Sequence, residues 1–335
     1  MEIRSDHDIY SDHVENTDDR CFETGPGLIR LNPVFKQMVW GGSRLRTEFG
    51  YEIPGDDTGE CWAISAHRHG DCTVKGGQYD GKTLSWLWEN RPGLFGEIHS
   101  EGFPLLVKII DAKQDLSVQV HPDDEYARIH EDGSRGKTEC WYILDCDPGA
   151  SIIIGHNAAS RGELADMIEN NRWSGLLREV PVKKGDFFQI FPGTVHAIKG
   201  GTLILETQQN SDITYRVYDY GRLQNGRPRD LHIRQSLDVI TVPFDENVSF
   251  DRGEPIPGGP DEALVKCAFY SVWHFKCTGD CTYRPSGKCL LCSVISGEGT
   301  VNGEKVSKAD HFIIPAGYET LRTTGEFEMI VSSPE

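Results

Sequence analysis

The sequence has few basic residues for its acidic content. Across 335 residues, 34 Lys and Arg stand against 52 Asp and Glu, which gives a net charge of −18 at pH 7. A field of that sign repels polyanions, so the surface as a whole is a poor match for nucleic acid or an anionic membrane. A run of 18 or more apolar residues is also missing, so no transmembrane helix is predicted.

The start of the chain lacks the apolar segment of a signal peptide, and we therefore expect a cytoplasmic protein. Residues 1–25 are polar, acidic and aperiodic, which predicts a flexible tail. The ten cysteines are then expected to be thiols. One set, Cys277, Cys281, Cys289 and Cys292, has a spacing similar to a zinc ribbon. Because the last two are three residues apart in a β-rich run, their side chains would point to opposite faces, which favours core packing over zinc.

Short apolar runs separated by Gly, Pro, Asp and Asn make up most of the chain and predict β-strands. The clearest are 103–111, 116–122, 140–145, 150–155, 186–193 and 202–209.

Two stretches indicate helices instead. Residues 82–90 are followed by a Pro-Gly stop, and 160–180 begin with Ser160 as N-cap and Glu163 at the capping-box position.

A weak internal repeat relates residues 184–196 to 308–320. Each copy has an Asp, a buried strand and a Pro/Gly turn, and another apolar strand follows. We therefore predict a mostly β protein of two cupin-like jelly-roll modules with a few short helices. The first module, 26–241, keeps a histidine after the turn and could bind a metal. Residues 242–262 form a linker, and the smaller module, 263–335, lacks ligands.

Metal ligands are suggested by three short segments. Gln119 and His121 share one face of a strand with Ser117, since side chains two apart point the same way. Glu139 follows Lys137 at the same spacing, and a histidine, His196, follows the Pro-Gly turn at 192–193. Two imidazoles and a carboxylate suit zinc or non-haem iron, and the spacing leaves both open. His69 has no ligand-like partner in the sequence, and His67 is interpreted as a structural residue.

Polar and charged residues fill 206–222, directly after an apolar strand. This segment is either a solvated edge loop or part of the site. In the second case Arg216 could clamp an anionic group.

Together these motifs resemble the type I mannose-6-phosphate isomerase (phosphomannose isomerase) family in its shorter bacterial form. The resemblance spans roughly residues 30–222 and lies in 39–42, 59–67, 103–108, 116–123, 136–139, 192–197 and 206–216. Where some longer members have a histidine before the lysine, this chain has Gly136, so no acid–base role can be carried over to that position.

The resemblance implies a set of site residues. One Zn²⁺ per chain would bind Gln119, His121, Glu139 and His196. The catalytic residues would be Arg216, Lys137 and Glu206, and the substrate-binding residues would be Ser117, Lys108, Trp40 and Arg222.

The implied reaction interconverts mannose 6-phosphate and fructose 6-phosphate by proton transfer through a cis-enediol. The base is left open between Glu206, Lys137 and a zinc-bound water. The partner would be a small sugar phosphate, and the chain a monomer or homodimer. Two alternatives remain: a sugar-phosphate sensor without catalysis, and an iron-dependent cupin oxygenase. Gln119, in place of the first histidine of the usual pair, counts against the oxygenase.

Overall fold

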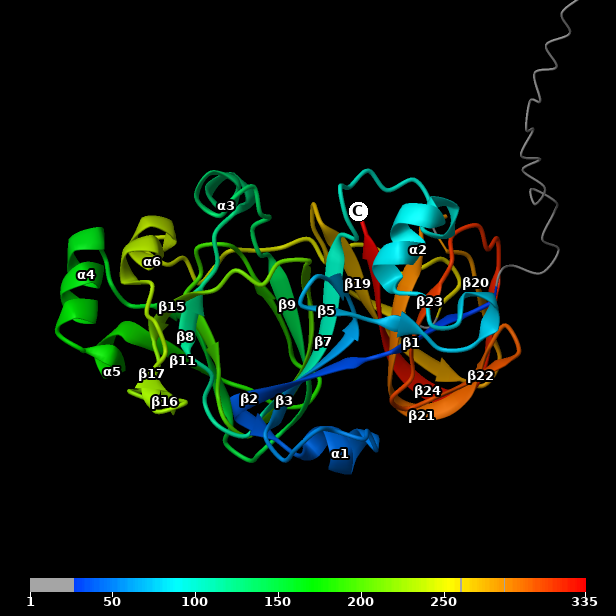
Figure 1. Cartoon of the computed structure of the whole chain (residues 1–335), viewed down its shortest axis with the longest axis horizontal. Helices are drawn as coiled ribbons and strands as arrows, with labels where there is room; N and C mark the ends of the chain where they lie inside the picture. Colours follow the sequence, from blue (N-terminus) through cyan, green and yellow to red (C-terminus); the bar gives the residue numbers. More distant parts are fainter. Residues whose placement is uncertain (1–26, 260, 286) are drawn as a thin grey trace, which may run out of the picture.

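The computed structural model describes residues 27–259, 261–285 and 287–335, so the predicted tail at 1–25 lies outside the described residues. The described chain is mostly antiparallel β-structure in two side-by-side units (Figure 1). This confirms the predicted fold class, and every apolar run named above contains a strand.

Two sheets face each other in the first unit and hold most of the predicted site residues between them. The six-stranded sheet has the order β12-β9-β14-β7-β3-β2, and the five-stranded sheet the order β11-β10-β13-β8-β15. The larger sheet comprises β2 (Val34–Gly42), β3 (Thr58–Ile64), β7 (Leu105–Ala112), β9 (Glu139–Cys146), β12 (Phe187–Ile190) and β14 (Thr202–Gln209). The smaller comprises β8 (Val118–Val120), β10 (Ser151–His156), β11 (Leu177–Pro181), β13 (His196–Ile198) and β15 (Tyr215–Tyr218).

The second unit is one nine-stranded sheet built mainly from the C-terminal part of the chain. Its strands are β18 (Asp261–Lys266), β19 (Tyr270–Thr278), β20 (Cys281–Tyr283), β21 (Leu290–Val301), β22 (Glu304–Ser307), β23 (His311–Ile314) and β24 (Leu321–Pro334), joined by β1 (Ile29–Asn32) and β6 (Thr73–Val74). The strand β1, drawn blue, crosses into the red and orange sheet and pairs with β23 (Figure 1). The start of the chain thus lies in the sheet of the second unit.

Two small hairpins complete the β-structure. One joins β4 (Ala66–His67) to β5 (Gly70–Asp71), and the other joins β16 (Leu223–Gln224) to β17 (Arg227–Pro228).

The helices are short and lie outside the sheets. They are α1 (Arg44–Phe49), α2 (Leu84–Asn90), α3 (Asp124–His130), α4 (Arg161–Glu169), α5 (Trp173–Leu176) and α6 (Ile233–Val239), with 3₁₀ turns at Gly77–Tyr79 and Pro92–Leu94. Helix α2 confirms the prediction over 82–90, and Thr83 caps it. Helices α4, α5 and α6 gather at the end of the first unit that is far from the second (Figure 1). Among the described residues, no helix has the length and apolar character needed to cross a membrane.

The predicted helix over 160–180 is only partly correct. Ser160 accepts a hydrogen bond from the Glu163 amide, which confirms the cap. The helix ends at Glu169, because Asn171 adopts a left-handed conformation with φ of 52°. The chain then makes the short α5 and enters β11, whose pairing with β10 overrides the helical preference of the sequence.

The cysteine prediction is confirmed for the described residues, where nine cysteines are free thiols. Cys289 packs in the core cluster that contains Leu291, and Cys292 in the cluster that contains Phe312. The two sulfurs therefore enter different cores and do not form a common metal site.

Candidate functional site

Three buried side chains from the two facing sheets converge at one point. His121 follows β8, Glu139 opens β9 and His196 opens β13. Strands β13 and β8 pair with His196 opposite Gln119, which brings two distant segments together. The ligand atoms of the two histidines and the glutamate lie within 4.8 Å of one another.

The hydrogen bonds of the two histidines fix their tautomers. His121 donates from Nδ1 to the Ile213 carbonyl at 2.7 Å, and His196 donates from Nδ1 to the Thr194 carbonyl at 2.9 Å. Each neutral ring therefore carries a lone pair on Nε2, and the two Nε2 atoms face each other at 3.2 Å. Burial lowers the pKa of His196 to about 4 and that of His121 well below its ordinary value, so a proton does not separate them at neutral pH.

Glu139 completes an arrangement that fits a divalent cation. Its Oε1 lies 3.4 Å from His196 Nε2, and its Oε2 lies 3.5 Å from His121 Nε2. The buried Oε1 has no hydrogen-bond partner among the described residues. Two imidazole lone pairs and a carboxylate oxygen at one buried point are the donor set of a metal site. Gln119 lies beside them, with its amide nitrogen 3.3 Å from His196 Nε2.

Two lysines link this point to further carboxylates. Lys137 contacts Glu139 directly, and its Nζ lies 3.4 Å from His121 Nε2 and 3.8 Å from Glu206 Oε1. Lys108, paired with Glu206 in the β7–β14 register, lies 3.5 Å from its carboxylate and 3.8 Å from that of Glu60. Two lysines thus meet three carboxylates, and this excess of negative charge also suits a cation.

The two inner carboxylates differ in proton affinity. Burial acts to raise the pKa of Glu206, but the charges of Lys137 and Lys108 outweigh it and lower the pKa to about 2. For Glu139, burial and then the charge of Glu206 raise the pKa. Burial also opposes the charged form of Lys137, yet Glu139 and Glu206 raise its pKa, so the ammonium persists.

A cavity of about 110 Å³ opens beside these groups. It brings together seven of the predicted residues: Trp40, Lys108, Ser117, Gln119, Lys137, Glu206 and Arg216. Arg216, on β15, donates from Nη1 to the Asp230 carbonyl at 2.8 Å, while its buried Nε has no hydrogen-bond partner among the described residues. Burial and the charge of Arg229 lower the pKa of Arg216.

The three candidate metal ligands His121, Glu139 and His196 lie behind the lining of this cavity, and Arg222 does not line it either. Arg222 donates to the Asp115 carbonyl at 2.7 Å and to Asp219 at 2.7 Å. Arg229 lines the cavity instead and is held by two hydrogen bonds to Asp219, at 2.6 and 2.7 Å. The hairpin of β16 and β17 returns the chain to the site, and no local pattern in the sequence marks this return.

Other lining residues were also not predicted from the sequence. Glu60 accepts a hydrogen bond from the Trp62 indole at 2.6 Å and faces Lys108, and Thr214 lies two residues before Arg216. Gly136 has a steric reason to be glycine, since a Cβ there would lie 2.4 Å from the Asp123 carbonyl carbon. The backbone therefore leaves no room for the histidine of the longer proteins.

Comparison with known proteins identifies families and relatives that this chain matches. Residues 28–139 match the model of the phosphomannose isomerase type I catalytic domain, and 261–334 match that of the mannose-6-phosphate isomerase cupin domain. The chain is 50% identical over 307 residues to mannose-6-phosphate isomerase ManA of Bacillus subtilis, covering 90% of this chain and 97% of that protein. It is 47% identical over 307 residues to the mannose-6-phosphate isomerase of Streptococcus mutans, covering 90% and 96%.

A solved structure agrees. The crystal structure of the mannose 6-phosphate isomerase from Bacillus subtilis superimposes with a TM-score of 0.87 at 46% identity, covering 91% of this chain and 99% of that one. The cupin-type fold is thereby confirmed. Because it is 50% identical over 307 residues to a relative that it covers to 97%, the chain belongs to the type I phosphomannose isomerase family.

Proposed function

We propose that this protein is a zinc-dependent mannose-6-phosphate isomerase that interconverts mannose 6-phosphate and fructose 6-phosphate. The observation that carries the proposal is the pair of inward Nε2 lone pairs of His121 and His196 beside Glu139. These atoms contact Gln119 and Lys137, which line a cavity with cationic side chains. Support also comes from relatives at about half identity that bear this name.

The metal would be held by His121, Glu139 and His196, with Gln119 as a neutral fourth ligand. When bound, zinc supplies a Lewis acid that polarises the substrate carbonyl and stabilises negative charge on its oxygen. Zinc commonly takes four such nitrogen and oxygen ligands. An oxygenase needs several open positions on iron, and Gln119 and Lys137 crowd this point.

The charges orient the substrate in the cavity. Around Lys108 and Lys137 the carboxylates outnumber the ammonium groups, so a phosphate dianion is not favoured at the inner end. Arg216 and Arg229 stand where the inner cavity meets an outer groove of about 520 Å³. A hexose phosphate exceeds the inner cavity, so we place the sugar inside, next to Arg216, and the phosphate in the outer groove, at Arg229.

Proton transfer between C1 and C2 then falls to the inner residues. Glu206 is ionised, is fixed by a 3.1 Å hydrogen bond from the Trp141 indole, and has an Oε2 without a hydrogen-bond partner among the described residues. It can accept the proton from C2 and return it to C1. Lys137 stays protonated and can donate a proton to O1, and it takes one back from the C2 hydroxyl as the ketone forms. Because Glu206 has a low pKa, it is a weak base, and the transfer requires a polarised substrate carbonyl. Arg216 stabilises the negative charge that develops in the cis-enediol.

The test is a coupled assay that follows fructose 6-phosphate formed from mannose 6-phosphate, with Zn²⁺ supplied. The wild type is expected to turn over, and Glu206→Gln to lose at least about 100-fold in kcat with metal content unchanged. Glu179→Gln, on exposed β11, is the matched control and should keep full activity. Binding of mannose 6-phosphate without turnover by the wild type would favour the sensor. Iron loading with oxygen consumption would favour the oxygenase.

The domain bounds at 26–241, 242–262 and 263–335 are proposed as a catalytic module, a linker and an accessory module. Among the described strands, β1 and β6 cross this division because they join the second sheet, and β18 begins at Asp261, inside the proposed linker. A cytoplasmic location and a monomeric or homodimeric state remain predictions.

A further inference from the structure

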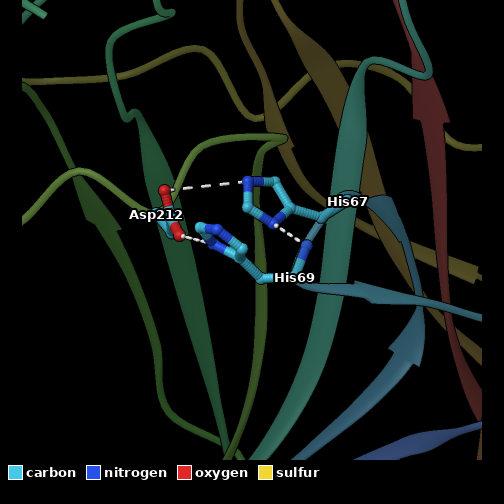
Figure 2. Close-up of side chains that lie close together, drawn as sticks. All are labelled: His67, His69 and Asp212. Carbon is cyan, nitrogen blue, oxygen red and sulfur yellow. Dashed lines mark hydrogen bonds and ion pairs between the residues drawn. The ribbon is translucent and has the colours of Figure 1, made fainter.

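A second group of metal-binding side chains lies outside the cavity. His67 ends β4, His69 stands in the turn before β5, and Asp212 lies in the segment between β14 and β15. Figure 2 shows the two imidazoles of the hairpin turned toward the Asp212 carboxylate. Their ligand atoms lie within 4.8 Å of one another, although 143 residues separate His69 from Asp212.

We propose that His67, His69 and Asp212 form a second metal site, which binds a divalent transition ion such as Zn²⁺. Two imidazoles and one carboxylate are the donors that such ions prefer. The side chains of His69 and Asp212 are 55% and 38% exposed, so water can complete the coordination. The ion would fasten the β4–β5 hairpin to the segment 210–214.

The protonation states at neutral pH suit a cation. Burial lowers the pKa of His67, so its ring is neutral. Partial burial acts to raise the pKa of Asp212, but its hydrogen bond with His69 outweighs this, and the carboxylate is ionised. The positive charges of Arg68 and Lys108 act on His67 and weaken the attraction for a cation.

The hydrogen bonds indicate what an ion must displace. His69 Nδ1 lies 2.6 Å from Asp212 Oδ2, and His67 Nε2 lies 3.7 Å from Oδ1. The His69 amide donates to His67 Nδ1 at 3.2 Å, so the neutral His67 ring carries its proton on Nε2. An ion takes over the two facing nitrogens, and each ring proton moves to the opposite nitrogen. Because His67 then loses the bond from the His69 amide, this site binds more weakly than the one at His121.

The position gives the second ion a structural role. Asp212 directly precedes Ile213, whose carbonyl accepts the Nδ1 proton of His121. Thr214 and Arg216, further along the same segment, line the cavity. Fixing Asp212 therefore holds the segment that orients His121 and Arg216, without contact between the ion and the substrate.

Zinc stoichiometry tests this site separately from the first. After dialysis against buffered, saturating Zn²⁺, the wild type is expected to hold two ions per chain. His69→Gln and Asp212→Asn should each hold one, and the exposed control His99→Gln should hold two. His121→Gln should also hold one, which His69→Gln in the same chain removes.

Cobalt gives a second readout. Co²⁺ added to His121→Gln should produce visible d–d absorption that disappears when His69→Gln is combined with it. The proposal is overturned if the saturated wild type holds a single ion, or if both His69→Gln and Asp212→Asn retain the second. These outcomes are read from the wild type, His69→Gln and Asp212→Asn, so they do not depend on whether His121→Gln folds.

Discussion

Both units of this protein bury histidines, but the two in the candidate site of the first unit differ in their hydrogen bonds from those of the second unit. In this site, the Nε2 atoms of His121 and His196 face each other, and their other contacts are long: Lys137 at 3.4 Å, Gln119 at 3.3 Å, and Glu139 at 3.4 and 3.5 Å. In the second unit, His311 has a partner on each nitrogen: the Tyr51 hydroxyl at 2.6 Å and the Ser293 hydroxyl at 2.9 Å.

His274 repeats the second pattern. Its Nδ1 lies 3.2 Å from the Tyr142 hydroxyl, and its Nε2 lies 2.7 Å from Glu328. Tyr51 and Tyr142 belong to the first unit, so the histidines of the second sheet join the two units. Burial alone therefore does not distinguish these histidines. The two proposed ligands His121 and His196 differ from the other two because their Nε2 atoms have no short hydrogen bond.

Substitution of a histidine in each unit should give the largest difference. His121→Ala removes a nitrogen donor from the proposed metal site, so we expect loss of that ion and a fall in turnover of more than about 1,000-fold. His274→Ala, which removes the contacts with Tyr142 and Glu328 but no proposed metal ligand, should keep the ion and most of the turnover. Metal analysis and the coupled assay measure both. Retention of the ion by His121→Ala would contradict the assignment.

Arginine substitutions test which residue binds the phosphate: Arg222, which the sequence predicts as substrate-binding, or Arg229, which lines the cavity in the structure. Arg216→Ala should keep the metal and lower kcat/KM by about 100-fold, since it removes a charge that stabilises the transition state. Arg229→Ala should mainly raise KM, because we place it at the phosphate. Arg222→Ala serves as the comparison and should change KM less. A larger rise in KM for Arg222→Ala than for Arg229→Ala would show that the phosphate lies elsewhere.

Metal removal should destabilise the protein through its first unit. If an ion binds only the folded state and its free concentration is 100 times its Kd, it contributes about 3 kcal/mol to the free energy of unfolding. We therefore expect a chelator to lower the Tm of the wild type and added Zn²⁺ to restore it. His196→Gln, which lacks a ligand, should respond much less, and His311→Gln should respond as the wild type does. An equal response of His196→Gln and the wild type would place the stabilising ion elsewhere.

The smallest effect concerns His311 and pH. Burial lowers the pKa of His311 from 6.5 to about 3. Between these values the unfolded chain binds a proton that the folded protein excludes, so the free energy of unfolding falls as the pH falls. His311→Gln should make this dependence shallower by about 1 kcal/mol per pH unit, as measured by urea unfolding at several pH values. The exposed control His99→Gln should keep the wild-type slope.

The strands were predictable from the sequence because alternating apolar residues mark buried strands irrespective of their partners. Residues 170–180 show the limit of such patterns, since the pairing of β11 with β10 decided their structure. The position of β1 could not be predicted from the sequence either, because Ile29 on β1 pairs with Ile313 on β23, 284 residues further along the chain.

Residues of the candidate site could be proposed where spacing on one strand placed them on one face, as for Gln119 and His121. Arg229 and the group of His67, His69 and Asp212 could not, because their positions depend on hairpins that bring distant segments together. Nor does spacing report a hydrogen bond, and the tautomers of His121 and His196 depend on the carbonyls of Ile213 and Thr194.

The most direct test of the central claim is anomalous diffraction at the zinc edge from crystals of the active protein grown with Zn²⁺. We predict a peak bounded by His121 Nε2, His196 Nε2 and the Glu139 carboxylate, and no peak at His274 or His311. A preparation that is fully active in the coupled assay but has no peak between these three residues would contradict the account.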